Sequence, residues 1–600
     1  DKWQIVTYSE LVNKVENIAL GLIKLGLQAG DLVGIKAHTS ARWTWADLGS
    51  NFAGCASVSL YPTLSKKETL YIAEHSEMKL LFVGDYKVLI DTLAYLDEMP
   101  NIKYVVCLEK GFKGNGTNIL GLGEVMHMGN MAREELMQEM KDRQENLTEH
   151  SPATMVYTSG TTGDQKGVML THRMVLHAAY RGYTHLHNHG HSQNYNIMAL
   201  AVLPLSHIME KVNSYYGPLC LGGCIGFSTP ATMLADIQVI RPTWVMWVPR
   251  LLSRVYLGFQ QAFSATEVGK AAWEWAMDVA VRASYELEDE HGRIDTTIPY
   301  PDQLTGQLRE EWINADNNVY WRIRHAFGGR VWDLNLGGAY VDPDLHRKFL
   351  GMGFCVTVGY GLTESGSGVV HAAADAAKVG YVGLVDPDTE LKLAEDGEIL
   401  MRARGVITEY YKNEAANRES FTEDGWFKTG DIGEFDEVGN LRIIDRKKTL
   451  IILDTGKNVA SARIEGLCSM SGLIDQIAVL GQDRKFISAL IVPNFDVIIN
   501  LMKAKGIPYD ESKVKYGEIS GMTTCIEVGP EVVENEAVVK AIQNEVDKVN
   551  AQLEDYEKIK TFRILNKTFT EESGELTPSQ KVKMKVVSEN YADIIEDIYK

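Results

Sequence analysis

The chain has 600 residues, of which 45% are hydrophobic and 23% charged, and its formal net charge at pH 7 is −20. A globular chain of this length holds more than one domain. Nucleic-acid-binding proteins usually present a basic face, so the acidic balance excludes nucleic acid as an expected partner. Seven cysteines are scattered through mostly apolar segments, which is typical of a reduced cytoplasmic protein without disulfides.

Short apolar strands alternate with helices along most of the chain. Apolar spacing predicts a helix over residues 7–30, and residues 265–330 are expected to form a helical insertion. Strands are predicted at residues 33–35, 80–83, 104–107, 153–157, 198–202, 244–247, 355–358 and 441–444. The alternation predicts an α/β protein: a large multi-layer N-terminal domain of mostly parallel sheets with helices, and a smaller α+β C-terminal lid domain.

The residue pattern of the sequence changes near Asp445, and we take this change as the boundary between the two domains. We place the N-terminal domain at residues 1–444, a hinge linker at 445–448 and a mobile C-terminal domain at 449–600. No run of 18 or more apolar residues occurs, so no membrane-spanning helix is predicted. Peripheral contact with a membrane and a homodimer both stay open at this point.

The most informative segment is Tyr157-Thr-Ser-Gly-Thr-Thr-Gly-Asp-Gln-Lys-Gly-Val168, which follows a predicted strand. Its glycines allow close backbone approach, so N–H groups, hydroxyls and the ammonium of Lys166 can surround a polyphosphate. The P-loop of kinases and GTPases requires Gly-Lys-Ser/Thr, which is absent here. The segment therefore predicts a phosphate loop of another kind. The expected contacts are Thr158, Ser159, Gly160, Thr161, Thr162, Gly163 and Lys166.

A second motif, Val358-Gly-Tyr-Gly-Leu-Thr-Glu-Ser365, is expected in a turn at the carboxyl end of a strand, where open α/β sheets bind ligands. There Tyr360 can stack on a base, and Thr363 can bond a phosphate oxygen. Glu364 can hold Mg²⁺, a cation that prefers oxygen ligands. The alternative is an ordinary loop with a solvated acid.

A third motif places Asp431 between glycines, where its two oxygens can accept both hydroxyls of a ribose. The alternative is a β-turn acid. In Asp445-Arg-Lys-Lys448, Arg446 can bind ribose or phosphate as a planar fork, or the segment is a solvated linker. Lys581, on a short loop near the end, indicates nothing by itself.

In this order the segments resemble the adenylate-forming superfamily, which includes acyl-CoA synthetases, firefly-type luciferases and adenylation domains of peptide synthetases. The resemblance runs along nearly the whole chain, from Thr7 to Lys581. It is greatest for long-chain fatty-acid–CoA ligases, including the bubblegum-like branch. Asp445-Arg-Lys-Lys448, Gly456-Lys-Asn-Val-Ala460 and the insertion at 265–330 carry this part of the likeness.

The resemblance implies that a fatty acid, expected to be a long-chain one, reacts with ATP to give an acyl-adenylate and then with CoA to give a thioester, releasing AMP and pyrophosphate. ATP, Mg²⁺ and CoA are the implied cofactors. Lys581 would be the catalytic lysine, and Lys448 the hinge. The other implied catalytic residues are Glu364, Thr363 and His207. The implied nucleotide or CoA contacts, besides the phosphate loop, are Gly338, Ala339, Tyr360, Gly361, Asp431, Arg446, Lys448, Gly456 and Lys457. The implied metal ligands are Glu364 and Thr162.

Two alternative functions stay open: transfer of the acyl group to a carrier-protein thiol, and a non-enzymatic acyl or nucleotide binder. Tyr340 stands where the family usually has proline, at the border of the acyl and adenine pockets. His185, His187, His189 and His191 alternate. On a strand they would share one face and suit Zn²⁺ or Ni²⁺, but the neighbouring Asn188 and Gly190 favour an exposed loop.

Overall fold

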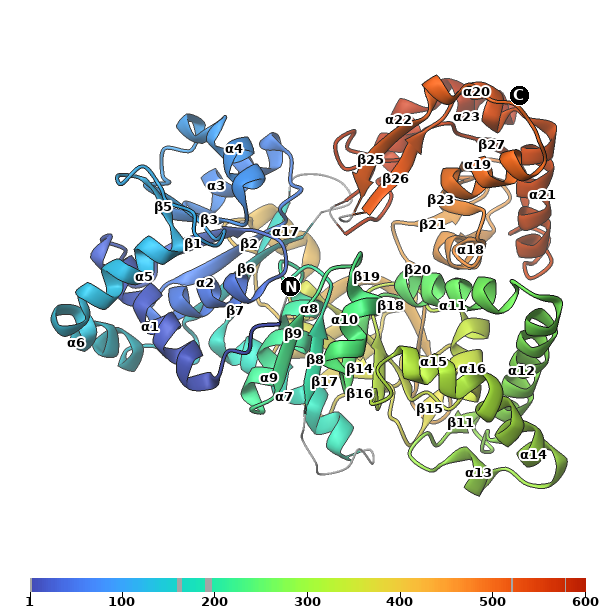
Figure 1. Ribbon diagram of the computed structural model, residues 1–600, viewed down its shortest axis with the longest axis horizontal. Helices are drawn as coiled ribbons and strands as arrows, with labels where there is room; N and C mark the ends of the chain where they lie inside the picture. The colour runs from blue at the N-terminus through green and yellow to red at the C-terminus, as the bar shows by residue number, and fades with distance from the viewer. Residues whose placement is uncertain (1–2, 159–164, 189–196, 520–521, 578) are drawn as a thin grey trace.

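A computed structural model describes residues 3–158, 165–188, 197–519, 522–577 and 579–600. Two sheet-based lobes form the N-terminal part, and residues from about 450 onward form a separate unit beside them (Figure 1). This is the mixed α/β architecture, with a smaller C-terminal domain, that the alternating pattern predicted. In the described residues no helix is long and apolar enough to cross a membrane.

The first sheet has seven strands in the order β5-β4-β3-β1-β2-β6-β7. All neighbours are parallel except the β6–β7 pair. Helices α1, α2 and α5 cover one face, and α3 and α4 the other. The strands are β1 Leu32–Lys36, β2 Ala56–Leu60, β3 Leu80–Val83, β4 Tyr104–Cys107, β5 Ile119–Gly121, β6 Pro152–Thr158 and β7 Lys166–Thr171. The helices are α1 Tyr8–Lys24, α2 Ala41–Phe52, α3 Lys66–Ser76, α4 Tyr86–Leu93, η1 Leu96–Glu98, α5 Leu122–Met131 and α6 Arg133–Glu145.

Helix α1 is shorter than predicted. It begins after a capping box in which Thr7 and Glu10 satisfy each other's backbone N–H groups. It ends at Lys24, whereas the prediction extended to residue 30. Gly26 and Gly30 adopt positive φ angles of 88° and 87°, which terminate the helix and turn the chain into β1.

The second sheet has the order β16-β14-β13-β12-β10-β8-β9, and its β13–β14 and β14–β16 pairs are antiparallel. Its strands are β8 Met198–Ala201, β9 Cys224–Phe227, β10 Trp244–Trp247, β12 Asp333–Leu336, β13 Val356–Leu362, β14 Ser367–His371 and β16 Leu384–Val385. The helices beside it are α7 His172–Asn188, α8 Ile208–Glu210, η2 Lys211–Tyr216, α9 Gly217–Cys220, α10 Met233–Ile240 and α16 Pro343–Gly351.

Strand β13 corrects one prediction. The segment containing Tyr360 and Gly361 was expected in a turn, but β13 continues to Leu362 and pairs with β14. A register shift between Tyr360 and Gly361 bends the strand there. Thr363 and Glu364 follow in a short 3₁₀ helix, η4 Thr363–Ser365.

The insertion at 265–330 is helical, apart from the two-residue strand β11 Arg293–Ile294, which pairs with β15 Ala377–Lys378. Its elements pack with the second sheet into one apolar core. Together with the preceding helix they are α11 Pro249–Phe263, α12 Glu267–Glu286, α13 Tyr300–Gln303, α14 Gly306–Ala315, η3 Asp316–Tyr320 and α15 Trp321–Ala326.

A small antiparallel sheet, β17-β18-β19-β20, leads out of the N-terminal part. It comprises β17 Thr389–Leu393, β18 Glu398–Ala403, β19 Phe427–Phe435 and β20 Leu441–Arg446, with α17 Glu414–Ser420 between β18 and β19. Strand β20 therefore includes Asp445 and Arg446, and a turn at residues 447–449 leads to the next unit.

The C-terminal unit combines a three-stranded sheet, β23-β24-β27, with helices around two apolar cores of its own. Its strands are β21 Leu450–Ile452, β22 Asn458–Ala460, β23 Ile474–Leu480, β24 Ile487–Pro493, β25 Lys515–Ile519, β26 Met522–Glu527 and β27 Ile559–Ile564. Its helices are α18 Ser461–Cys468, α19 Phe495–Ala504, η5 Glu511–Lys513, α20 Pro530–Val533, α21 Glu536–Asn550, α22 Met584–Asn590 and α23 Ala592–Tyr599.

The cysteine and histidine predictions have different outcomes. All seven cysteines are free, as expected. Neither the strand nor the loop considered for the histidine segment is correct at His185, His187 and Asn188, because all three lie in helix α7; His189 and His191 lie outside the described residues. Among the described residues, no group of three or more His, Cys, Asp or Glu side chains is arranged to hold a metal ion.

Candidate active site

A cavity of about 2560 Å³ lies where the small sheet, the edges of both large sheets and the C-terminal unit meet. It is lined by most of the residues predicted from the sequence. These are Thr158, Lys166, His207, Gly338, Ala339, Tyr360, Gly361, Thr363, Glu364, Asp431, Arg446, Lys448 and Lys581. Segments more than 400 residues apart in the chain therefore contribute to one site.

One corner of the cavity is organised around Asp431. Strands β19 and β20 place Asp431 directly opposite Arg446, and the Arg446 Nε donates to one carboxylate oxygen at 2.9 Å. The Tyr360 hydroxyl donates to the other oxygen at 2.8 Å. The negative charge of Asp431 raises the pKa of Arg446. Each carboxylate oxygen keeps a second lone pair, so Asp431 is held in place and can still accept hydroxyl donors.

A second corner contains Glu364, which is 9% exposed. The Tyr410 hydroxyl donates to its Oε1 at 2.7 Å. The Lys166 ammonium lies 4.7 Å from the centre of the Tyr410 ring. Tyr410 thus ties the carboxylate to the lysine of the phosphate loop, although no role was assigned to it from the sequence. The Tyr410-Tyr411 pair is visible in the sequence, but nothing there shows that one hydroxyl reaches Glu364.

The phosphate loop is anchored at both ends. Thr158 ends β6 and Lys166 begins β7, and the two residues pair across the antiparallel strands. The Tyr71 hydroxyl donates to the Gln165 carbonyl at 2.9 Å. The predicted contacts Ser159, Gly160, Thr161, Thr162 and Gly163 lie outside the described residues.

His207 caps α8 at the cavity wall. Its Nδ1 accepts the backbone N–H of Met209 at 3.2 Å. Burial and the nearby positive charge of Lys581 lower the pKa of His207 to about 4. The imidazole is therefore neutral at physiological pH, and its wall position suits apolar or neutral contacts.

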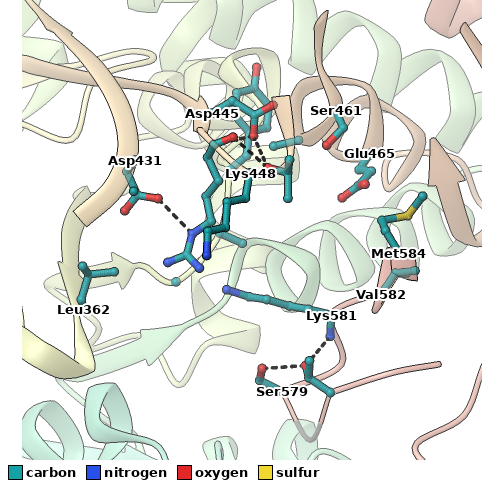
Figure 2. Close-up of a pocket in the computed structure, with 18 of the residues that line it drawn as sticks. Leu362, Asp431, Asp445, Lys448, Ser461, Glu465, Ser579, Lys581, Val582 and Met584 are labelled. Atoms are coloured by element: carbon teal, nitrogen blue, oxygen red, sulfur yellow. Dashed lines mark hydrogen bonds and ion pairs between the residues drawn. The ribbon is translucent and has the colours of Figure 1, made fainter. Parts of the chain in front are cut away.

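Lys581 enters the cavity from the C-terminal unit on a tight loop. Its backbone N–H donates to the Thr577 hydroxyl at 3.0 Å, and its carbonyl accepts the Thr577 N–H at 2.8 Å. The side chains of Lys581 and Lys448 converge beside Asp431 (Figure 2). Burial and the positive charge of Arg446 lower the pKa of Lys581. Cationic groups from two domains thus gather at one point, and an anionic ligand would relieve their repulsion.

Two predicted residues are not brought to this cavity. Gly456 and Lys457 occupy the turn between β21 and β22, and neither lines the cavity. The Lys457 ammonium instead lies 5.4 Å from the Tyr556 ring centre. Gly456 has a φ of 78°, which suits a glycine turn.

Glu465, on α18 of the C-terminal unit, is a site residue that the sequence reasoning missed. It lines the cavity near Lys581 (Figure 2). Burial and the negative charge of Asp445 raise the pKa of Glu465 to about 8, while the charge of Lys581 opposes the rise. An isolated Glu inside a helix gives no signal of this position.

The residues at Glu364 fit a hard divalent cation. A mostly buried carboxylate beside a phosphate-loop lysine offers oxygen ligation at a point where polyphosphate charge would concentrate. The corner at Asp431 fits a ribose. Together the fold and the site define a two-domain α/β protein whose cavity, covered by the C-terminal unit, fits a nucleotide.

Comparison with known families agrees with this class. The sequence matches the model of AMP-binding enzymes over residues 1–411, and that of the AMP-binding enzyme C-terminal domain over residues 526–600. The chain belongs to the AMP-binding enzyme family.

Curated relatives cover the whole chain. The long-chain-fatty-acid–CoA ligase FadD15 of Mycobacterium tuberculosis is 34% identical over 606 residues, which span all of this chain and 92% of the relative. The long-chain-fatty-acid–CoA ligase ACSBG2 of Xenopus laevis is 29% identical over 624 residues, spanning all of this chain and 80% of the relative.

Solved structures share the fold at lower identity. The adenylation domain of a carboxylic acid reductase from Segniliparus rugosus, in complex with AMP and a co-purified carboxylic acid, superposes with a TM-score of 0.71. Its identity is 20%, and the match covers all of this chain and 87% of the other. The o-succinylbenzoate CoA synthetase of Bacillus subtilis, in complex with ATP and magnesium ion, has a TM-score of 0.62 at 20% identity, covering 97% and 94% of the two chains.

Proposed function

We propose that this protein activates a fatty acid with ATP and transfers the acyl group to CoA. In the first step, a carboxylate oxygen of the acid attacks the α-phosphorus of ATP, and the bond to the outgoing pyrophosphate breaks. In the second, the thiol sulfur of CoA attacks the acyl carbon, the bond to AMP breaks, and the thiol loses its proton. The products are AMP, pyrophosphate and an acyl-CoA.

One observation carries the proposal. Lys581 from the C-terminal unit and Asp431, Arg446 and Glu364 from the N-terminal part line the same cavity. The first step brings an anionic acid to an anionic triphosphate, so cations and donors must be in place before reaction. Glu364 offers a carboxylate for a cation, and Asp431 offers one for a ribose. Arg446 and Lys581 supply the positive charge.

Each residue has a definable task in the first step. Asp431, fixed by Tyr360 and Arg446, would accept the ribose hydroxyls. Lys166 would pair with the outgoing phosphates, and Lys581 would bridge the acid and the α-phosphate. Glu364 would hold Mg²⁺, which would supply charge neutralisation on the phosphates when bound.

The second step needs a different arrangement. Gly456 and Lys457 lie away from the cavity, while Lys581 occupies it. We propose that the C-terminal domain, residues 449–600, rotates about Lys448, withdraws Lys581 and brings the 456–457 turn toward CoA. Sequestration in each arrangement would protect the water-sensitive adenylate.

The proposed acyl group is long and apolar, as it is in the names of the curated relatives. His207 would stand at the mouth of the acyl site, with the β8 end and residues 244–249 nearby. Each buried methylene contributes about 0.8 kcal/mol, so the KM should fall with chain length until the site is full.

The test is pyrophosphate release measured for acids of two to about twenty carbons, with and without CoA. We expect the highest kcat/KM on acids of a dozen or more carbons, and CoA-dependent thioester formation. Activity confined to acetate or coumarate would refute the long-chain assignment. Adenylate formation without transfer to CoA would favour another thiol as the acceptor.

A further inference from the structure

The C-terminal domain touches the N-terminal part through a small set of specific contacts outside the predicted site. Three of them involve residues of the C-terminal domain that line the same cavity as Lys581. These residues are Asp475 on β23, Gly466 on α18, and Lys583 just after the loop that carries Lys581. None of these residues has a task in the two half-reactions described above.

Asp475 is held by two arginines of helix α11. The Arg250 Nη2 donates to the Asp475 carboxylate at 2.8 Å and to its backbone carbonyl at 2.7 Å. The Arg254 Nη2 donates to the same carboxylate oxygen at 3.2 Å. Asp475 is 25% exposed and the arginines 36% and 51%. Helix α11 precedes the insertion and packs beside the second sheet, so it belongs to the N-terminal part. This cluster therefore fixes β23 to the N-terminal part.

Tyr340 makes the second contact. The residue follows the Gly338-Ala339 turn, and its ring lies over the bare backbone of Gly466. A Cβ added at Gly466 would lie 2.4 Å from the Tyr340 Cδ1 and 2.8 Å from its Cε1, closer than real contacts allow. Burial raises the pKa of Tyr340 to about 12. The residue that replaces the family's usual proline therefore packs against the mobile domain.

The third contact is made with the first lobe. The Lys583 ammonium is 3.5 Å from the Glu68 carboxylate on α3. Lys583 is two residues from Lys581, so this ion pair reports directly on whether the loop is seated. It supplies a measurable marker of the arrangement.

We propose that Asp475 and Tyr340 are positioning residues for Lys581: the Arg250–Asp475–Arg254 cluster and the Tyr340–Gly466 contact hold the domain in its adenylation arrangement. This inference rests on the proposed function. Both contacts must break if the domain rotates. Weakening either one shifts the population away from the arrangement that places Lys581 in the cavity, and leaves the other arrangement intact.

The first experiment is Asp475→Asn, assayed separately for the two half-reactions. Exposed ion pairs change an equilibrium by up to about fivefold, and two arginines share this carboxylate. We expect adenylate formation to slow by about three- to tenfold, with thioester formation from supplied acyl-adenylate unchanged or faster. Asp597→Asn is the matched control, because Asp597 pairs with Arg563 within the C-terminal domain; both half-reactions should be unchanged.

The second experiment is a double-mutant cycle at the packing contact. Gly466→Ala should fold, because alanine favours a helix more than glycine does. Its methyl group should collide with Tyr340 and slow adenylate formation by about fivefold or more. In a Tyr340→Ala background the ring is gone, so the same Gly466→Ala change should have an effect under about twofold.

A structural readout accompanies both. A zero-length carbodiimide joins an amine to a carboxylate only in direct contact, so the yield of the Lys583–Glu68 cross-link, quantified by mass spectrometry, measures the seated arrangement. The yield should fall in Asp475→Asn, in Gly466→Ala and in Tyr340→Ala, and adding Gly466→Ala to the Tyr340→Ala background should change it by less than about twofold.

Equal loss of both half-reactions, an unchanged cross-link yield, or the same Gly466→Ala effect in both backgrounds would overturn the proposal. Failure of the proposed function looks different. In that case the wild-type protein would release no pyrophosphate with any acid, while the cross-link would still form and still respond to the variants.

Discussion

Glu364 and Tyr410 form a hydrogen bond that no sequence motif reveals. Glu364→Gln keeps the shape of the side chain but removes the charge that would hold a hard cation. We expect turnover to fall and the Mg²⁺ concentration for half-maximal activity to rise by about tenfold or more. Titration of activity with Mg²⁺ measures this. Tyr410→Phe, which removes the hydroxyl alone, should shift the titration less, and an unchanged Mg²⁺ dependence in Glu364→Gln would place the metal elsewhere.

Lys581 is the only predicted catalytic group carried by the C-terminal unit. Lys581→Ala should abolish adenylate formation, because no other ammonium on that loop's tip replaces it at the α-phosphate. Thioester formation from supplied acyl-adenylate should be largely spared. Pyrophosphate release and acyl-CoA formation, measured separately, check this division. Comparable loss in both half-reactions would contradict it.

At the scale of elements, the short helix α8 is tied to the neighbouring strand by the buried carboxyl group of Glu210. The Glu210 Oε1 accepts the backbone N–H groups of Val202 and Leu203 at 2.8 and 3.2 Å, so it ties α8 to the end of β8. Burial raises the pKa of Glu210 to about 8. The unfolded chain loses this proton near pH 4.5, whereas the folded protein keeps it until about pH 8. Rising pH therefore costs stability between these values.

Glu210→Gln keeps the acceptor oxygen and cannot ionise. We expect its free energy of unfolding to exceed that of the wild type increasingly from pH 5 to pH 8, by up to about 1.4 kcal/mol per pH unit. Urea unfolding at both pH values measures the difference. A constant difference across that range would show that the Glu210 carboxyl titrates normally.

The π-helix η2 joins the two large sheets through a fully buried ion pair. The Lys211 ammonium lies 3.0 Å from the Asp47 carboxylate and donates to Thr154 at 2.6 Å. Lys211→Met leaves the Asp47 charge buried without its partner, which should cost about 3–5 kcal/mol in urea unfolding. Lys24→Met, at the exposed pair with Glu135, is the control and should change stability by less than about 0.5 kcal/mol. A small effect at Lys211 would mean that water reaches Asp47.

Elements buried on both faces were predictable. The strands at 80–83, 104–107 and 244–247 match the predicted bounds, because parallel strands covered by helices appear in sequence as uninterrupted apolar runs. The ends of helices and strands that are set by backbone angles were not predictable from the sequence. Helix α1 stops early because of Gly26, and β13 continues through a glycine motif that looks like a turn.

The residues of the candidate active site divide in the same way, into those that local motifs reveal and those that depend on tertiary contacts. Glu364 and Asp431 were recognisable because their motifs are local, and both line the cavity. Tyr410 and Asp475 were missed because each acts through a partner distant in sequence, Glu364 and Arg250 respectively. Tyr340 was noticed as a departure, but its contact with the C-terminal domain depends on tertiary structure.

At the scale of the whole molecule, the proposed rotation of the C-terminal domain makes a prediction at Lys448. Lys448 is exposed, lies in the turn between β20 and β21, and lines the cavity. Lys448→Pro would fix its φ near −65°. If the two arrangements need different backbone angles there, adenylate formation should proceed at near the wild-type rate while transfer to CoA collapses. Half-reaction rates measure this. Intact acyl-CoA synthesis in Lys448→Pro would place the pivot at another residue.

The buried pair of Asp47 and Lys211 also has a consequence during synthesis. The two residues are 164 positions apart, and Asp47 contacts Lys211, Tyr215 and Tyr216 in the finished protein. A ribosome adding about 5–20 residues per second needs roughly 10–30 s to pass from one to the other. During that interval the Asp47 carboxylate lacks the Lys211 ammonium, so closing the core around it carries the cost of burying an unpaired charge. We therefore expect the first lobe to pack fully around Asp47 only after the residues up to Tyr216 have left the ribosome.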